Sequence, residues 1–144
     1  MKQFTTYSEK ETKDLAKKLA KKLTGVIALI GELGSGKTTF AQGFAAGLGI
    51  KEKIISPTFV LIRQHRIPKT EKTLYHIDLY RLEDFTELGL KDLMEDPNNI
   101  VLIEWAEKIK DQLPQNTTYI KFKTLSETKR EIKISTSKIN NILL

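Results

Sequence analysis

The sequence predicts an α/β domain of three layers, with helices covering the faces of a central sheet. Apolar runs of strand length alternate along the chain with segments of helical periodicity, which is the pattern of such domains. Two runs, residues 26–30 and 100–103, are continuously apolar, as expected for central strands that are buried on both faces. The length of 144 residues suits one compact unit, so we expect a single domain over residues 1–144.

The first half of the chain opens with a short edge strand, expected at residues 4–6, and a helix. Ser8 followed by Glu11 is a capping-box pattern. Leucines then recur every four residues, which predicts an amphipathic helix over residues 9–23. The next expected elements are the buried strand at 26–30 and a second helix at 37–48.

The second half of the chain contains more strand-like segments than helices. Residues 58–65 and 73–79 read as strands that are separated by a loop around Pro68. An acidic segment at 84–95 has helical character and precedes the buried strand at 100–103. Apolar and polar residues alternate at 119–123 and 131–135, which predicts two half-exposed strands of a closing hairpin.

The composition excludes several kinds of site. The chain has no cysteine, so disulfides, thiolate metal sites and cysteine nucleophiles are excluded. No run of about 18 apolar residues occurs, and the first residues contain no apolar stretch of the signal-peptide type. We therefore expect no membrane association and a cytoplasmic location.

The formal charge of +6 is concentrated at the two ends of the chain. Residues 1–24 hold seven lysines against three acidic residues, and residues 107–144 hold eight basic residues against four acidic ones. Such ends have a weak electrostatic affinity for anionic partners such as RNA. Because no aromatic residues are interleaved with the lysines, we favour solvated helix and strand faces over an RNA-binding surface.

The strongest signal is a phosphate-binding loop. Residues 31–38, GELGSGKT, match the pattern G-x-x-x-x-G-K-[ST] between a predicted strand and a predicted helix. Its glycines let successive backbone N–H groups turn toward phosphate oxygens, and the helix N-terminus adds its dipole. Lys37 is expected to reach the β- and γ-phosphates and Thr38 to complete a Mg²⁺ shell. The expected nucleotide contacts in this segment are Glu32, Leu33, Gly34, Ser35, Gly36, Lys37, Thr38 and Thr39.

Two acidic residues compete for the roles of metal ligand and water-positioning group. Glu104 follows the apolar run 100–103, and Asp78 ends a second apolar strand at 74–77. A phosphate-binding loop requires an acid at the end of a neighbouring strand, and either residue meets that requirement. His76 is a candidate base, although a histidine within a buried strand is more often structural.

Two further positions are candidates for nucleotide contact. Thr58, in the segment SPTF, has the place of a hydroxyl that senses a γ-phosphate, although Pro57 is equally consistent with the mere start of a strand. Trp105 follows Glu104 directly and is expected either in the core or beside the nucleotide.

Missing motifs narrow the nucleotide and the reaction. The chain contains no N-K-x-D guanine-binding motif, so ATP is the better candidate than GTP. No arginine-rich lid segment occurs, which weakens the alternative of a small-molecule kinase. The candidates for a charge-stabilising arginine are Arg63, Arg66 and Arg81.

Taken together, four segments resemble the TsaE (YjeE) family. They are GELGSGKTTF, SPTF, HIDLYRLED with ELGL after it, and VLIEWAEKI, in the family's order and spacing over residues 25–109. The resemblance is more specific than the phosphate-binding loop alone, because HxDLYR and IEW are unusual companions to it. It implies a P-loop NTPase fold with a mixed, mostly parallel central sheet.

The resemblance also implies a function and its site residues. It implies an ATP- and Mg²⁺-dependent ATPase, weak alone, that is needed for threonylcarbamoyl modification of the adenosine beside the anticodon in tRNAs reading ANN codons. In that family the protein does not transfer the threonylcarbamoyl group but binds the TsaB–TsaD complex, through which we expect contact with tRNA. The family's phosphate and Mg²⁺ residues, switch-like segment, acidic motif residues and nucleotide-side tryptophan match, by position, Lys37, Thr38, Thr58, Asp78, Glu104 and Trp105.

Two rival functions remain open from the sequence. One is a small-molecule kinase that uses the same loop, and the other is a nucleotide-gated RNA-binding module that uses the basic ends. Release of free phosphate without an acceptor separates the expected ATPase from the kinase. Steep salt dependence of direct tRNA binding favours the RNA-binding module.

Overall fold

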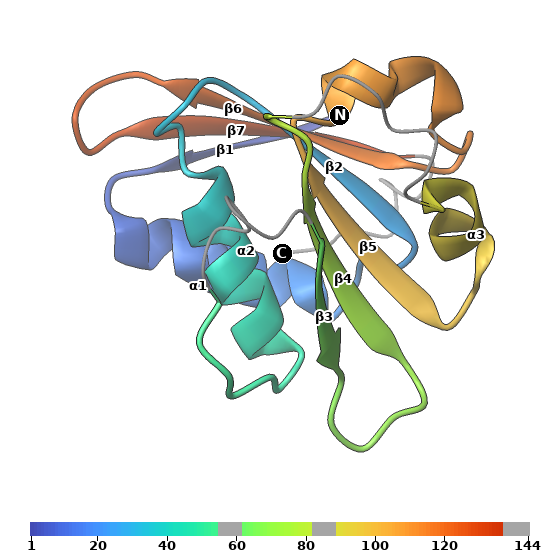
Figure 1. Ribbon diagram of the computed structural model, residues 1–144. Helices are drawn as coiled ribbons and strands as arrows, with labels where there is room; N and C mark the ends of the chain where they lie inside the picture. Colours follow the sequence, from blue (N-terminus) through green and yellow to red (C-terminus); the bar gives the residue numbers. More distant parts are fainter. Residues whose placement is uncertain (55–61, 82–88, 137–144) are drawn as a thin grey trace.

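The computed structural model describes residues 1–54, 62–81 and 89–136. Within these residues the chain forms one seven-stranded sheet with helices on both faces (Figure 1). In chain order the elements are β1 (Lys2–Thr6), α1 (Glu9–Ala20), β2 (Val26–Ile30), α2 (Lys37–Gly47), β3 (Ile62–Arg66), β4 (Thr73–Asp78), α3 (Leu90–Glu95), β5 (Asn99–Glu104), the 3₁₀ helix η2 (Ala106–Gln112), β6 (Thr118–Thr124) and β7 (Arg130–Ser135).

The sheet is mixed, and its parallel strands lie at the centre. The strand order is β1-β7-β6-β2-β5-β4-β3. β2 pairs in parallel with β5 and β6, and β4 pairs in parallel with β5. The outer pairs, β1 with β7, β6 with β7 and β3 with β4, are antiparallel. The predicted three-layer α/β fold is confirmed, as are the edge strand and the closing hairpin of β6 and β7.

Helices α1 and α2 lie side by side on one face of the sheet (Figure 1). Leu19 of α1 and Phe44 of α2 are fully buried in a core cluster that includes residues of β2, β4, β5 and β6. The two helices approach closely, because a Cβ atom at Gly43 of α2 would lie only 2.4 Å from the Lys13 carbonyl oxygen of α1. This contact fixes α2, and with it the loop that precedes α2, against the first helix.

The opposite face of the sheet is covered by α3 and η2 (Figure 1). Leu90 of α3 and Ile109 of η2 are buried there with Ile77 of β4 and Ile103 of β5. Successive side chains along β4 and β5 therefore alternate between the core under α1 and α2 and the core under α3 and η2. None of the helices in the described ranges has the length and apolar character that crossing a bilayer would need.

The element boundaries differ from the expected ones in a few places. The Ser8 side chain caps α1 by accepting from the Glu11 N–H, as predicted, but the helix ends at Ala20 and a turn carries the chain to the buried Leu23. Residues 58–61 of the third expected strand and 84–88 of the acidic segment lie outside the described residues. The helix η2 was not expected, because its residues show no clear helical period.

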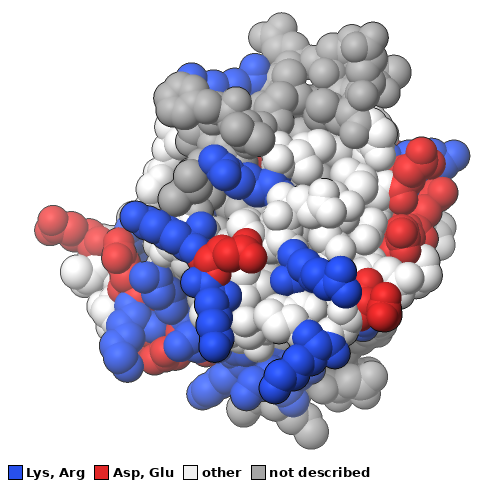
Figure 2. Space-filling model, turned by 60° about the horizontal axis from the view of Figure 1, so that its bottom comes forward, with Lys and Arg blue, Asp and Glu red and all other residues white. Residues whose placement is uncertain are grey.

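Basic side chains are spread over the exposed surface. Six of the seven lysines in residues 1–24 are exposed. On the face shown in Figure 2, Lys and Arg side chains predominate and Asp and Glu side chains lie among them.

The parallel arrangement brings the candidate functional residues to one edge of the sheet. The phosphate-binding loop follows β2, whereas Asp78 and Glu104 are the last residues of β4 and β5. Glu104 is the register partner of Asp78 on one side and of Leu29 on the other. Ligands of open α/β sheets bind at this carboxyl-end edge.

Candidate functional site

The phosphate-binding loop joins β2 to the N-terminus of α2. Gly34 and Gly36 have φ angles of 74° and 107°, in the left-handed region that only glycine adopts without strain. Gly36 is the N-cap of α2, with no side-chain cap, and Lys37 is the first residue of the helix. The first N–H groups of α2 therefore have no capping partner from a side chain, which is the arrangement that binds anions at a helix N-terminus.

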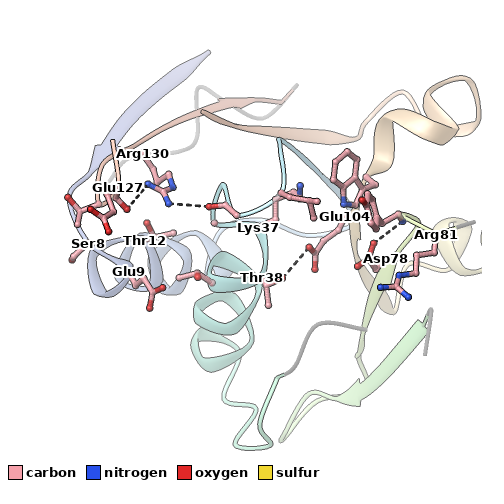
Figure 3. Close-up of a pocket in the computed structure, with 17 residues that line it drawn as sticks. Ser8, Glu9, Thr12, Lys37, Thr38, Asp78, Arg81, Glu104, Glu127 and Arg130 are labelled. Atoms are coloured by element: carbon pink, nitrogen blue, oxygen red, sulfur yellow. Dashed lines mark hydrogen bonds between the residues drawn. The ribbon is translucent and has the colours of Figure 1, made fainter. Parts of the chain in front are cut away.

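A cavity of about 780 Å³ lies beside this loop. Figure 3 shows charged side chains at both ends of the cavity, with Lys37 and Thr38 between them. We call the end near the strand termini the phosphate half; it is lined by Gly36, Lys37, Thr38, Thr39, Asp78, Tyr80, Arg81, Glu104 and Trp105. The other end, the nucleoside half, is lined by Ser8, Glu9, Thr12, Leu33, Gly34, Glu127, Thr128 and Arg130.

The ammonium group of Lys37 lies in the middle of the phosphate half. Its Nζ atom donates to the backbone carbonyls of Gly31 and Glu32, the latter at 3.1 Å. It also lies 4.0 Å from the centroid of the Trp105 ring, a cation–π contact. Burial lowers the pKa of Lys37 below its usual value, against the opposing attraction of Glu104 and other nearby carboxylates. A partly desolvated cation of this kind gains strongly from an anionic ligand.

The carboxylate of Glu104 links β5 to α2 and to β4. The Thr38 hydroxyl donates to Oε1 of Glu104 at 3.3 Å, and Nε2 of His76 lies 2.5 Å from Oε2. Glu104 is only 3% exposed and His76 only 1%. A buried carboxylate requires such partners because it has lost its hydration.

Asp78 is the neighbour of Glu104 at the sheet edge. Its Oδ1 atom accepts a hydrogen bond from the Tyr80 N–H at 2.9 Å. Burial raises the pKa of Asp78 above its usual value, and the nearby Glu104 raises it further, against the Tyr80 hydrogen bond and His76. Asp78 therefore holds a proton more readily than an exposed aspartate does.

The chemistry of these groups fits a magnesium ion bound together with phosphates. Within the described parts of the chain, no group of three or more histidine, aspartate or glutamate side chains is arranged to hold a metal alone. Mg²⁺ in phosphate-transfer sites takes one or two carboxylates and a hydroxyl, and completes its octahedron with phosphate oxygens and water. Thr38 and Glu104 offer such hard oxygen ligands side by side.

Trp105 has a strained backbone next to the acidic residue. Its φ angle is 60°, which is rare for a large side chain. The indole ring lies against the Lys37 ammonium group, and the Tyr80 ring packs against the indole at a tilt of 37°, with centroids 4.9 Å apart. Strain of this type collects at functional sites, where the surrounding structure holds it in place.

The remaining predicted residues divide between the cavity and its surroundings. Leu33, Gly34, Gly36 and Thr39 line the cavity, whereas Ser35 is buried behind the loop and Glu32 supplies a carbonyl to Lys37. Thr58 lies outside the described residues. Of the three candidate arginines, Arg81 lines the cavity, and Arg63 and Arg66 are not among its lining residues.

Apart from Leu33 and Gly34, the residues of the nucleoside half were not found from the sequence. This half is built from the N-terminus of α1 and the turn between β6 and β7, which are joined through β1 and β7. Arg130 donates to the Gly34 carbonyl at 3.1 Å and also to the carbonyls of Ser126 and Lys129. One arginine thereby ties the β6–β7 turn to the phosphate-binding loop. The only signal in the sequence was the predicted hairpin itself.

Comparison with known proteins identifies the family. The family model described as threonylcarbamoyl adenosine biosynthesis protein TsaE matches residues 6–132. The tRNA threonylcarbamoyladenosine biosynthesis protein TsaE of Bacillus subtilis is 43% identical over 135 residues, which cover 90% of this chain and 82% of the relative. The protein of the same name from Treponema pallidum is 40% identical, over 76% of this chain and 81% of the relative.

A solved structure agrees with these matches. The crystal structure of Bacillus subtilis YdiB superposes with a TM-score of 0.78 at 34% identity, covering 94% of this chain and 84% of that one. The residues matched by the family model include the phosphate-binding loop. The chain therefore belongs to the TsaE family of threonylcarbamoyladenosine biosynthesis proteins.

Proposed function

We propose that this chain is a Mg²⁺-dependent ATPase subunit for threonylcarbamoyl modification of the adenosine beside the anticodon in tRNAs reading ANN codons. It acts in the cytoplasm with the TsaB–TsaD complex and does not transfer the threonylcarbamoyl group itself. The observation that carries the proposal is the contact between Thr38 and Glu104, 3.3 Å apart, directly beside Lys37 of the phosphate-binding loop.

The phosphate half suits the triphosphate of ATP. The loop amides and the N-terminus of α2 bind anionic oxygens, and Lys37 exchanges its contacts with the Gly31 and Glu32 carbonyls for phosphate oxygens. The gain is large because the ammonium group is partly desolvated before the phosphates arrive. Lys37 then stabilises the charge that develops on the γ-phosphate during hydrolysis.

The nucleoside half suits the ribose and base. It extends from the loop to the N-terminus of α1 and the β6–β7 turn, and its polar groups include Ser8, Glu9 and Arg130. These groups offer hydrogen-bond donors and acceptors, and no guanine-binding motif occurs in the chain. ATP is therefore the nucleotide that we propose.

The two acidic residues have different roles in the proposed hydrolysis. A water molecule attacks the γ-phosphorus, the bond to the departing ADP breaks, and the water gives up a proton. Glu104 shares its hydrogen bond with Thr38 and is the ligand at the metal side, whereas Asp78 orients the water. The raised pKa of Asp78 suits a group that accepts a proton from this water. Thr38 and Glu104 would hold Mg²⁺, which would supply positive charge that stabilises the phosphates.

The surface around the cavity suits a protein partner. Leu33 and Tyr80 line the cavity and remain 67% and 41% exposed, so both side chains are available to a partner. A partner that covers them would also exclude water from the reacting phosphate. We assign this role to the TsaB–TsaD complex, and contact with tRNA passes through that complex.

Phosphate release from ATP, measured without any added acceptor, tests this function. The chain alone is expected to release phosphate slowly, and the TsaB–TsaD complex is expected to stimulate the release. Glu104→Gln should slow the stimulated release by about 100-fold, whereas Glu71→Gln, an exposed change outside the cavity, should leave the rate unchanged. Absence of phosphate release in the presence of the complex, or transfer of the phosphate to a small-molecule acceptor, contradicts the proposal.

A further inference from the structure

His76 is a buried residue of β4 next to the candidate site. It stands two residues before Asp78, so the two side chains share one face of the sheet. Glu104 is the register partner of Asp78 and projects from the same face. The imidazole of His76 is therefore behind the acidic residues, in the interior, and it is not among the residues that line the cavity.

The two carboxylate oxygens of Glu104 have different hydrogen-bond partners. Oε2 faces Nε2 of His76 at 2.5 Å, and Oε1 accepts from the Thr38 hydroxyl at 3.3 Å. Since the His76 contact is the shorter of the two, it restricts rotation of the carboxylate most strongly. Oε1 is consequently the oxygen that is presented toward Thr38 and the phosphate half.

The surroundings of His76 select one tautomer. Among the described residues, its buried Nδ1 atom has no hydrogen-bond partner. A proton on Nδ1 would leave a buried N–H group unsatisfied and would leave Nε2 without a proton to give to the carboxylate. The neutral ring with its proton on Nε2 satisfies the bond to Glu104.

We propose that His76 is a positioning residue, which holds Glu104 by an Nε2–H···Oε2 hydrogen bond so that Oε1 faces Thr38. This inference rests on the proposed function, in which Glu104 lies at the metal side of the phosphates. It extends that function to a residue that never touches nucleotide. Outer hydrogen bonds of this kind commonly change metal affinity or activity about 10- to 100-fold when they are removed.

A purely structural histidine would have different consequences. If His76 only filled space, a phenylalanine of similar shape would serve equally well, because β4 is buried at this point. If His76 holds Glu104, removal of its N–H group leaves Oε2 of a buried carboxylate unpartnered and free to turn. Loss of stability is possible in both cases, but only the second case changes the Mg²⁺ concentration that nucleotide binding requires.

The chain supplies a matched control in its other histidine. His65 of β3 also faces a carboxylate, with Nδ1 2.6 Å from Oε2 of Glu52, but this Glu52 side chain is 64% exposed and neither residue lines the cavity. Because the chain contains only two histidines, the His65→Gln variant also assigns the signals of both.

The first arm of the test is nitrogen NMR of the imidazole rings, recorded without nucleotide or metal. His76 is expected to show a slowly exchanging proton on Nε2, and Glu104→Gln is expected to shift its Nε2 signal. His65→Gln should leave these signals in place. Absence of a proton on Nε2 of His76, or an Nε2 signal that does not respond to Glu104→Gln, overturns the proposal. This arm needs no catalysis, so it is independent of the ATPase assignment.

The second arm measures how much Mg²⁺ is needed for tight binding of a non-hydrolysable ATP analogue. His76→Phe is expected to raise that Mg²⁺ concentration about 10- to 100-fold and to leave binding of the analogue without Mg²⁺ within about threefold. His76→Gln, whose amide supplies an N–H donor, should recover part of the loss, and His65→Gln should match the wild type. Equal Mg²⁺ requirements in wild type and His76→Phe overturn the proposal.

A double variant separates positioning from packing. If His76 acts through Glu104, adding His76→Phe to Glu104→Gln should cost almost nothing further in Mg²⁺ requirement. Additive losses overturn the proposal. If the melting curve shows that His76→Phe does not fold, the same comparison is made with His76→Gln, in the wild type and in Glu104→Gln. Together with the NMR arm, this comparison then tests the proposal. If the wild type binds no nucleotide at all, the proposed function fails, and the NMR arm still reports on the contact itself.

Discussion

The two halves of the cavity are built on different principles. In the phosphate half, Lys37, Asp78 and Glu104 are 5%, 8% and 3% exposed, and the last two are register partners at the ends of parallel strands. In the nucleoside half, Glu9 and Glu127 are exposed and come from a helix start and a hairpin turn. The groups to which we assign the chemistry are therefore desolvated and fixed by the sheet, whereas the groups that we assign to the nucleoside stand on surface elements.

This difference has an energetic consequence. Buried charges strengthen electrostatic contacts with phosphate, but they lower the stability of the protein before phosphate binds. Burial lowers the pKa of Lys37 and raises the pKa of Asp78. Both shifts have the same cause, because burial disfavours the charged form of each group. Substitutions in the phosphate half should therefore change nucleotide binding or hydrolysis strongly, and some of them should raise the stability of the nucleotide-free fold. Substitutions in the nucleoside half should have smaller effects on both quantities.

The largest expected effect belongs to Lys37→Ala. This substitution removes the cation that balances the phosphates within a buried site, so we expect ATP binding to fall roughly 100-fold or more, beyond detection in an ordinary titration. Calorimetric titration with ATP and Mg²⁺ measures it. An affinity equal to that of the wild type would remove the assignment of the phosphate half.

The next effect distinguishes the two acidic residues. Glu104→Gln and Asp78→Asn should each slow ATP turnover by about 100-fold, with ATP binding nearly kept. Only Glu104→Gln should also raise the Mg²⁺ concentration required for half-maximal binding, since Thr38 contacts Glu104. Turnover and binding measured over a Mg²⁺ series check both statements. A Mg²⁺ requirement raised by Asp78→Asn instead would exchange the two roles.

A smaller effect is expected at the joint between the halves. Arg130→Ala removes the hydrogen bond to the Gly34 carbonyl and frees the β6–β7 turn from the loop. Nucleotide binding should weaken about 3- to 10-fold, in keeping with the loss of about one or two hydrogen bonds. Lys129→Ala, at the neighbouring position, is the control and should bind as the wild type does. Equal affinities of the two variants would show that the turn does not support the loop.

The smallest effect concerns stability and its pH dependence. Because the pKa of Asp78 is raised in the folded protein, ionisation of this group favours the unfolded chain, and its cost appears as the pH rises from acid toward neutral. Asp78→Asn should therefore raise the melting temperature of the nucleotide-free protein at pH 7, by about 1 to 3 °C. The difference should vanish at acid pH, where Asp78 is protonated. Melting curves over a pH series measure it, and a gain that persists at acid pH would contradict this origin.

The phosphate half was largely predictable from the sequence, because its signals are local. The glycines and Lys37 occupy fixed places in a short motif, and Asp78 and Glu104 each end an apolar strand. Once the strands are parallel, such ends meet at one edge, which is why two residues separated by 26 positions in the chain are register partners.

The nucleoside half beyond Leu33 and Gly34 was not predictable because it depends on contacts between distant segments. Arg130 and Gly34 are brought together only when β7 adds to the sheet between β1 and β6, and no periodicity encodes that order. The partner of His76 was hidden for the same reason, since a buried strand histidine has the same appearance in sequence whether it packs or positions. The left-handed backbone of Trp105 likewise belongs to the turn into η2, and no residue pattern in the sequence predicts this turn.

In the proposed function, nucleotide use by this chain supports modification of tRNA. The most direct measurement is the amount of threonylcarbamoyladenosine in bulk tRNA after the protein is depleted from its own cells. We predict that the level falls, that the wild-type chain restores it, and that Lys37→Ala does not. An unchanged level after depletion, or full restoration by Lys37→Ala, would contradict the account.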